Sequence, residues 1–215
     1  MFKMILKITA LMLSFCLLGT GCSTGGNTAD APTEQATEES KDETAKGTDE
    51  TMTNENNPRV RMTLEDGGVI EMELYPEVAP LSVDLFLDGV ESGYYDGKVF
   101  HRAVPGFMIQ GGSPNGDGIG GMDKSIKGEF LSNGVVNELS HKRGVVSLAR
   151  TSAPNSASGQ FFIMHDDGEF LDGNYAAFGM VTSGMEYVDE IAEMPTSGEM
   201  LIEKPVIESM VIIED

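Results

Sequence analysis

Downstream of Pro58 the apolar residues occur in short runs separated by glycine-rich turns, and this pattern limits the fold more than any other feature of the sequence. In residues 60–64 and 70–74, apolar and polar residues alternate on either side of the turn Asp66-Gly67-Gly68. A period of two around a glycine turn predicts a β-hairpin. Further short apolar runs follow at residues 99–100, 107–109, 145–149, 161–164, 176–181 and 205–213. We expect each of these runs to form a strand.

Two segments carry helical signals instead. Pro80 suits the first turn of a helix, and we expect that helix to continue until Gly89 and Gly93 end it. Ser183 and Glu186 have the spacing of a capping box and predict the start of a second helix. About eight short strands with only two helices predict a mainly β fold, namely a closed eight-stranded antiparallel barrel capped by two α-helices.

The N-terminal residues are typical of an export signal. Two early lysines precede a mostly apolar run at residues 8–18, which ends at Gly19-Thr20-Gly21 and Cys22. A basic start, a short apolar run and small residues at the cleavage site mark a secretory peptide, and the run is too short to span a membrane. The segment resembles the lipobox of bacterial lipoproteins. We expect residues 1–22 to be a signal peptide ending at a lipidated Cys22, which would place the protein outside the cytoplasm on a bacterial cell membrane. A plain secreted protein with an incidental cysteine is the alternative.

The composition changes at residue 58. Residues 23–57 are acidic, contain no aromatic residue and predict a disordered linker, which is either a spacer or a passive leader. Residues 58–215 are long enough for one domain with its own core, and they contain no cysteine for a disulfide or a thiolate zinc site. This domain has 26 acidic against 10 basic residues. The acidic balance argues against nucleic-acid binding and favours a monomer.

Several kinds of chemistry lack the residues that they need. Residues 115–121 suggest a calcium loop, but Ile119 and Ile126 occupy positions that require oxygen ligands. The glycines of the same segment lack the Lys-Ser/Thr of a phosphate-binding loop. Ser147, Ser156 and Ser158 lie near His165 in the sequence without a nucleophile elbow. His101, His141 and His165 are widely spaced. We therefore expect no metal and no cofactor.

Three motifs resemble a known family. They are "FHRAVPGFMIQGG" at residues 100–112, "GVVSLARTSAPNSASGQFFI" at residues 144–163 and "FLDGNYAAFG" at residues 170–179. In this order they are similar to the cyclophilins, a family of peptidyl-prolyl cis-trans isomerases, and particularly to the bacterial branch. The resemblance spans residues 58–215. It implies an eight-stranded β-barrel capped by two helices, with the site on its outer face.

The resemblance also implies roles for individual residues. Arg102 would be the catalytic cation, with Gln110 as a second catalytic group that contacts the substrate backbone. The other implied substrate-binding residues are Phe107, Met108, Phe162 and Leu171 in an apolar cup, Ala149 and Arg150 at its rim, Gln160 as a polar contact, and Phe170 and Tyr175. Phe170 stands where the family often has tryptophan and Tyr175 where it often has histidine. The first difference removes an indole donor and puts tight cyclosporin binding in doubt.

These residue types suit rotation about an amide bond. Twisting the bond localises the nitrogen lone pair, and a guanidinium aimed at that nitrogen binds the twisted state preferentially. We therefore predict a prolyl isomerase that acts on proline-containing peptides and unfolded exported proteins, with a membrane anchor at Cys22. Two alternatives stay open. The barrel could bind proline segments without turnover, or it could be a structural scaffold of the cell envelope.

Overall fold

The computed structural model describes residues 56–213. The predicted signal peptide with Cys22 lies outside the described residues, and so does the acidic linker except for Asn56 and Asn57. Within the described part, no helix has both the length and the apolar character needed to cross a membrane.

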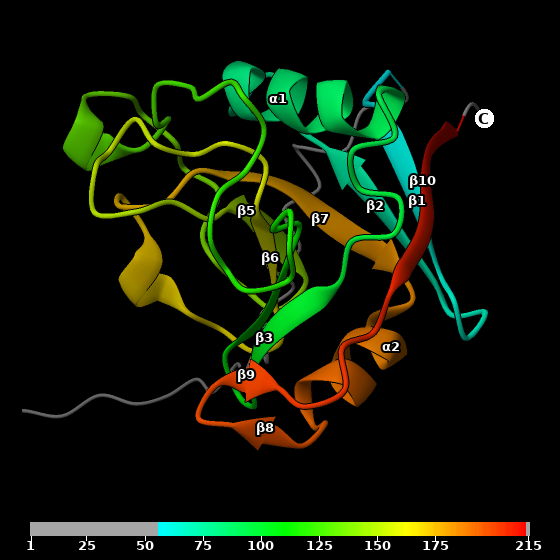
Figure 1. The fold of residues 1–215 in the computed structure, drawn as a ribbon. Helices are drawn as coiled ribbons and strands as arrows, with labels where there is room; N and C mark the ends of the chain where they lie inside the picture. Colours follow the sequence, from blue (N-terminus) through cyan, green and yellow to red (C-terminus); the bar gives the residue numbers. More distant parts are fainter. Residues whose placement is uncertain (1–55, 214–215) are drawn as a thin grey trace, which may run out of the picture. The chain divides into compact units, whose positions relative to one another are not determined.

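The described residues form a mainly β structure with two α-helices, as the sequence predicts (Figure 1). The strands are β1 (Arg59–Leu64), β2 (Val69–Leu74), β3 (Phe100–Val104), β4 (Met108–Gly111), β5 (Val145–Leu148), β6 (Phe161–Met164), β7 (Ala177–Ser183), β8 (Thr196–Ser197), β9 (Met200–Leu201) and β10 (Ile207–Ile213). All pair antiparallel, in the order β10-β1-β2-β7-β5-β6-β4-β3-β9-β8. Every strand run expected from the sequence contributes to this sheet.

The sheet differs from the predicted closed eight-stranded barrel in two ways. It has ten strands, because the two-residue strands β8 and β9 add a small hairpin beside β3. Within the described residues, the order of paired strands also begins at β10 and ends at β8, and these two strands do not pair with each other to close a barrel. The segment before β3 nevertheless lies against the start of β10. Val99 pairs with Val206, Gly97 N–H donates to the Ile207 carbonyl and Ile207 N–H donates to the Lys98 carbonyl, each at 2.8 Å, and Phe100 N–H donates to the Pro205 carbonyl at 2.9 Å. Pro205 has no N–H to continue a ladder there.

Helix α1 (Pro80–Glu91) begins with proline in its first turn, as predicted. Its N-cap residue, Ala79, has no side chain that could accept from the first N–H groups. The buried carboxylate of Glu129 does so instead, accepting from the N–H groups of Leu81 and Ser82 at 3.0 and 2.8 Å and from the Ser82 hydroxyl at 2.7 Å. A residue 47 positions away in the sequence therefore caps this helix.

Two helix boundaries differ from the prediction. Gly89 lies inside α1, where a Cβ would meet the Tyr95 ring at 2.5 Å, so glycine serves close packing there and does not end the helix. Helix α2 (Met185–Ala192) begins after Gly184, whose φ of +87° favours glycine. Ser183 is the last residue of β7 and makes no capping bond, so the predicted capping box is wrong.

The two helices lie on opposite sides of the strands (Figure 1).

The sheet buries apolar side chains on both faces. Strand β6 makes the division plain, because Phe161 and Ile163 belong to one cluster while Phe162 and Met164 belong to another. We call the larger cluster, which also contains the buried apolar residues of α1 and α2, the main core. We call the smaller one the outer cluster, and its buried members are Tyr75, Met108, Leu139, Val145, Phe162, Met164, Leu171 and Ala177. A strand buried on both faces reads as a continuous apolar run, which explains the segment "FFIM".

Candidate active site

A β-bulge in β3 places the arginine of the motif on the outer face of the sheet. Phe100 pairs with Gly111 and Arg102 pairs with Gln110, so His101 is an extra residue without a partner on β4. A regular strand would direct Phe100 and Arg102 to the same face. The bulge reverses the alternation, so Phe100 stays in the main core while Arg102 joins the outer face. This explains a lone cation in an otherwise apolar run.

The pairing continues across the sheet and sets three site residues in one row. Arg102 lies opposite Gln110, and Gln110 lies opposite Phe162 on β6. Residues that are directly opposite in antiparallel strands share a face, with Cβ atoms about 5 Å apart. Three residues that are up to 60 positions apart in the sequence therefore stand side by side.

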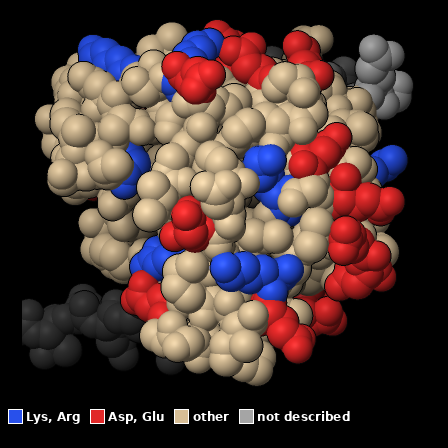
Figure 2. Space-filling model, in the orientation of Figure 1, with Lys and Arg blue, Asp and Glu red and all other residues tan. Residues whose placement is uncertain are grey.

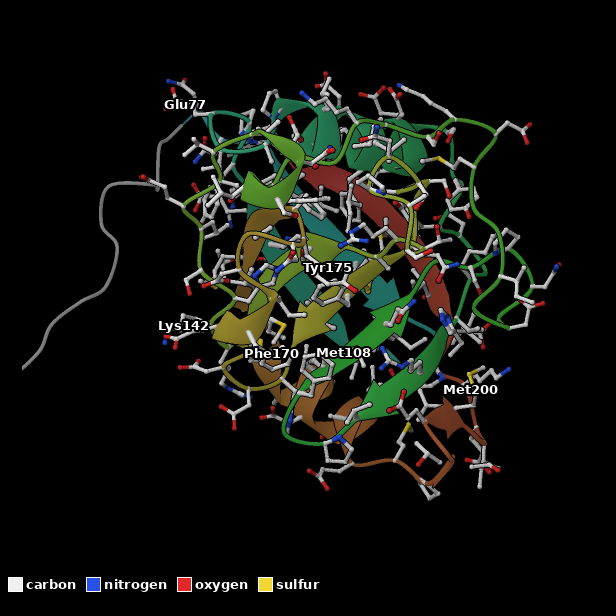
Figure 3. All side chains as sticks on the ribbon, turned by 90° about the vertical axis from the view of Figure 1, so that its left-hand side faces the viewer. Glu77, Met108, Lys142, Phe170, Tyr175 and Met200 are labelled. Carbon is white, nitrogen blue, oxygen red and sulfur yellow. The ribbon has the colours of Figure 1, made fainter. Side chains whose placement is uncertain are left out.

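This row borders a hollow of about 180 Å³. A cavity of about 150 Å³ accommodates a benzene ring, so the hollow is large enough for the five-membered ring of proline. Its lining consists of Arg102, Phe107, Met108, Gln110, Ala149, Arg150, Phe162, Leu171 and Tyr175. Nine of the eleven predicted active-site residues thus meet around one concavity. Figure 3 shows Met108, Phe170 and Tyr175 together on the face toward the viewer.

The other two predicted residues lie next to the hollow. Gln160 lines an adjoining depression that it shares with Gln110, Ala149 and Arg150. Phe170 is the middle residue of the 3-10 turn Glu169–Leu171 and is 72% exposed, with its ring 5.3 Å from the ring of Phe107. Phe170 therefore extends the apolar wall outward and does not line the hollow itself.

The polar side of the hollow is a chain of side-chain hydrogen bonds. Gln160 donates to the carbonyls of Gly118 and Gly120 at 3.0 and 2.8 Å, so its amide oxygen accepts from Gln110 at 2.9 Å. The amide oxygen of Gln110 then accepts from Nη1 of Arg102 at 3.1 Å. Each bond fixes the orientation of the next amide. The glycine-rich loop that contains Gly118 and Gly120 therefore orients Gln160.

Arg102 has a further partner that sequence reasoning did not find. Its Nε donates to Glu199, in the turn between β8 and β9, at 2.7 Å. Nη1 is also 3.5 Å from the sulfur of Met108. Nη2 makes no hydrogen bond within residues 56–213, so part of the guanidinium is available to a ligand.

The apolar side is organised around Phe162. Its ring meets the ring of Tyr175 edge-on at 5.8 Å and stacks on the imidazole of His141 at 6.0 Å. Edge-to-face and offset arrangements of this kind are the favoured ones for aromatic rings. The guanidinium of Arg150 lies over the Tyr175 ring at 4.6 Å and donates twice to the Asn174 carbonyl, which fixes the rim.

Behind Phe162 lies a buried polar group that the sequence did not reveal. His141 Nδ1 is 2.7 Å from Asp172, and His141 Nε2 is 3.0 Å from the Ser147 hydroxyl. With Nδ1–H donating to the carboxylate, Nε2 accepts from the hydroxyl. Burial lowers the pKa of His141, although the neighbouring carboxylate opposes that shift. Ser147 is fully buried, so this set supports the floor of the hollow and offers no accessible nucleophile.

The remaining histidines form no metal site in the described part of the chain, where no group of three potential ligands occurs. His101 is buried beside Gly118 in the bulge, and neither ring nitrogen meets a partner at hydrogen-bond geometry. Burial lowers its pKa to about 4, and the positive charges of Lys204 and Arg102 act in the same direction. His101 is therefore neutral at pH 7.

The site therefore combines a cation, two amide side chains and an apolar hollow large enough for one small ring. The chain matches the family model for cyclophilin type peptidyl-prolyl cis-trans isomerases over residues 59–213. The chain belongs to this family and is a peptidyl-prolyl cis-trans isomerase.

The chain is similar to isomerases of several organisms. Peptidyl-prolyl cis-trans isomerase B of Bacillus subtilis is 42% identical over 140 residues, which cover 65% of this chain and 94% of that protein. An isomerase of Acinetobacter baylyi is 43% identical over 135 residues, which cover 60% of this chain and 70% of that protein. The crystal structure of a cyclophilin of Cryptosporidium parvum is similar with a TM-score of 0.67 and 30% identity, covering 74% of this chain and 99% of that one. A second structure of that protein was determined in the presence of the dipeptide Ala-Pro.

Proposed function

We propose that Arg102 is the cation that stabilises the twisted X-Pro bond, and that the isomerase acts on unfolded exported proteins from a lipid anchor at Cys22. The position of Arg102 carries the first part of this proposal, because its guanidinium borders the same hollow as Phe107 and Phe162. The segment ending at Cys22 supports the second part.

The mechanism follows from the amide. A planar peptide bond resists rotation by about 18–20 kcal/mol because the nitrogen lone pair is delocalised into the carbonyl. Before proline the two isomers are close in energy and exchange slowly. With the proline ring in the hollow, rotation localises the lone pair on the imide nitrogen. The Nη2 group of Arg102 then donates to that nitrogen, an interaction that the planar ground state lacks.

One such bond accounts for only part of the acceleration. A charge-assisted hydrogen bond contributes about 1.5–3 kcal/mol, which corresponds to roughly ten- to a hundredfold in rate. The remainder comes from the apolar walls, which separate the rotating carbonyl from water, and from Gln110, which is positioned to contact the substrate backbone. No nucleophile or redox group takes part in this scheme.

Exchange spectroscopy on a short X-Pro peptide tests the role of Arg102. We expect Arg102→Ala to lower kcat/KM at least tenfold, and Arg102→Lys to recover little, because lysine is a point charge without a planar array of donors. Full activity of Arg102→Ala would refute the assigned role. If the protein were only a structural scaffold, variants of the residues that line the hollow would behave like the wild type in cells.

Cell fractionation tests the anchor. We expect the wild-type protein in the membrane fraction with a covalent lipid, and Cys22→Ser outside the cytoplasm but released from the membrane. Cys16→Ser is the matched control, since Cys16 lies within the expected signal peptide, and it should fractionate like the wild type. Membrane retention of Cys22→Ser would contradict the proposed anchor.

A further inference from the structure

The turn between β8 and β9 brings a carboxylate to the arginine of the hollow. Glu199 Oε2 accepts from Arg102 Nε at 2.7 Å, and these two residues are 97 positions apart in the sequence. The main chain of the turn is also bound to β3, because Ala103 N–H donates to the Glu199 carbonyl at 3.0 Å and Met200 pairs with Arg102. Glu199 is thus held by its backbone beside the strand that carries Arg102.

Glu199 and Gln110 hold the guanidinium at two different nitrogens. Glu199 binds Nε, and Gln110 binds Nη1. A free arginine side chain rotates about several single bonds, and freedom of that kind must be lost before the group can act on a substrate. Two acceptors at different nitrogens fix the guanidinium plane in advance, and they leave Nη2 without a partner in residues 56–213.

We propose that Glu199 is a positioning residue, which orients Arg102 for the rotating bond; this rests on the catalytic role proposed for Arg102. Glu199 acts as a hydrogen-bond acceptor in this role. Its negative charge by itself would weaken the guanidinium as a cation. The side chain of Glu199 is 58% exposed, so its replacement leaves the packing of the main core unchanged.

Three variants of the full chain separate the acceptor from the charge. Glu199→Ala removes both, and we expect kcat to fall about three- to tenfold with KM unchanged, because the arginine acts in the twisted state. Glu199→Gln keeps an acceptor oxygen without the charge, and we expect kcat within twofold of the wild type. Glu203→Ala removes an exposed acid from the neighbouring segment and serves as the matched control with wild-type kinetics.

A double-mutant cycle tests whether Glu199 acts through Arg102. We expect Glu199→Ala to have no further effect in the Arg102→Ala protein. Wild-type kcat in Glu199→Ala, an equal loss in Glu199→Gln, or an undiminished effect in the Arg102→Ala background would each overturn the inference. If Arg102→Ala is inactive while Glu199→Ala is fully active, the role of Glu199 is refuted and the role of Arg102 is not. A fully active Arg102→Ala would refute the catalytic role of the arginine itself.

Discussion

Phe161 and Phe162 are identical neighbours with different surroundings. Both are buried on β6, but Phe161 packs in the main core against Phe86, Tyr95 and Phe100. Phe162 faces outward into the outer cluster and borders the hollow. The alternation of a strand has thus placed one of two adjacent phenylalanines in the main core and the other in the wall of the hollow. The comparison teaches that burial alone does not identify a core residue in this sheet.

Alanine at each of these two positions should have the largest effects, on stability at one position and on activity at the other. We expect Phe161→Ala to lower the free energy of unfolding by about 3–5 kcal/mol, the usual range for a buried phenylalanine, while the folded protein keeps its kcat/KM. Phe162→Ala should lower kcat/KM more than tenfold, because the floor of the hollow is lost. Denaturant unfolding and the peptide assay, both at a temperature where each variant is folded, measure the two effects.

Equal kinetic losses in the two folded variants would contradict this division. Leucine at each position is the control for volume, since it restores much of the apolar contact. We expect Phe161→Leu to regain most of the lost stability.

His101 and Arg102 extend the comparison to β3, because the bulge buries the first and leaves the second at the hollow. The unfolded chain takes up a proton at His101 near pH 6.5, whereas the folded protein does so only at about pH 4. Between these values the unfolded state binds more protons, so stability falls as the pH falls. This difference amounts to about 2 kcal/mol at pH 5.

His101→Leu should therefore lose less stability than the wild type between pH 7 and pH 5, by about 2 kcal/mol. Parallel unfolding curves at the two pH values measure this difference. Both proteins keep His141, whose pKa is also lowered by burial, so its contribution cancels. Identical pH dependence in the two proteins would show that His101 is not the acid-sensitive group.

Local patterns predicted the strands and the motifs predicted the site, because both depend on residues that are close in the sequence. The alternation around Gly67 predicted the first hairpin, and the motif at residues 100–112 indicated Arg102 and Gln110 as site residues. Contacts between distant residues left no such signal. Glu129 caps α1 from afar, Asp172 reaches His141 from 31 positions away in the sequence, and the two-residue strands beside Glu199 are too short to recognise.

Glu129 caps α1, a helix that packs in the main core, so we expect it to affect stability and not activity. Its carboxylate satisfies three donors at the start of α1, and loss of a helix cap costs about 0.5–2 kcal/mol. We expect Glu129→Ala to lower the free energy of unfolding by about 2 kcal/mol and Glu129→Gln by about half as much, with unchanged kcat/KM. Exposed Glu138 provides the control, since Glu138→Ala should have almost no effect. A lower kcat/KM in Glu129→Ala would contradict the view that this residue affects stability only.

The smallest expected effect concerns the turn that carries Phe107 on the outer face. His165 accepts from Gly106 N–H through Nδ1 at 2.9 Å, and its Nε2 lies 3.3 Å from Asp189 on α2. Asparagine can present an acceptor at the position of Nδ1, whereas glutamine can replace only Nε2. We therefore expect His165→Gln to raise KM about threefold, the effect of one exposed hydrogen bond, and His165→Asn to keep the wild-type KM. Peptide titration measures both, and equal values for the two variants would mean that His165 does not hold the turn through Nδ1.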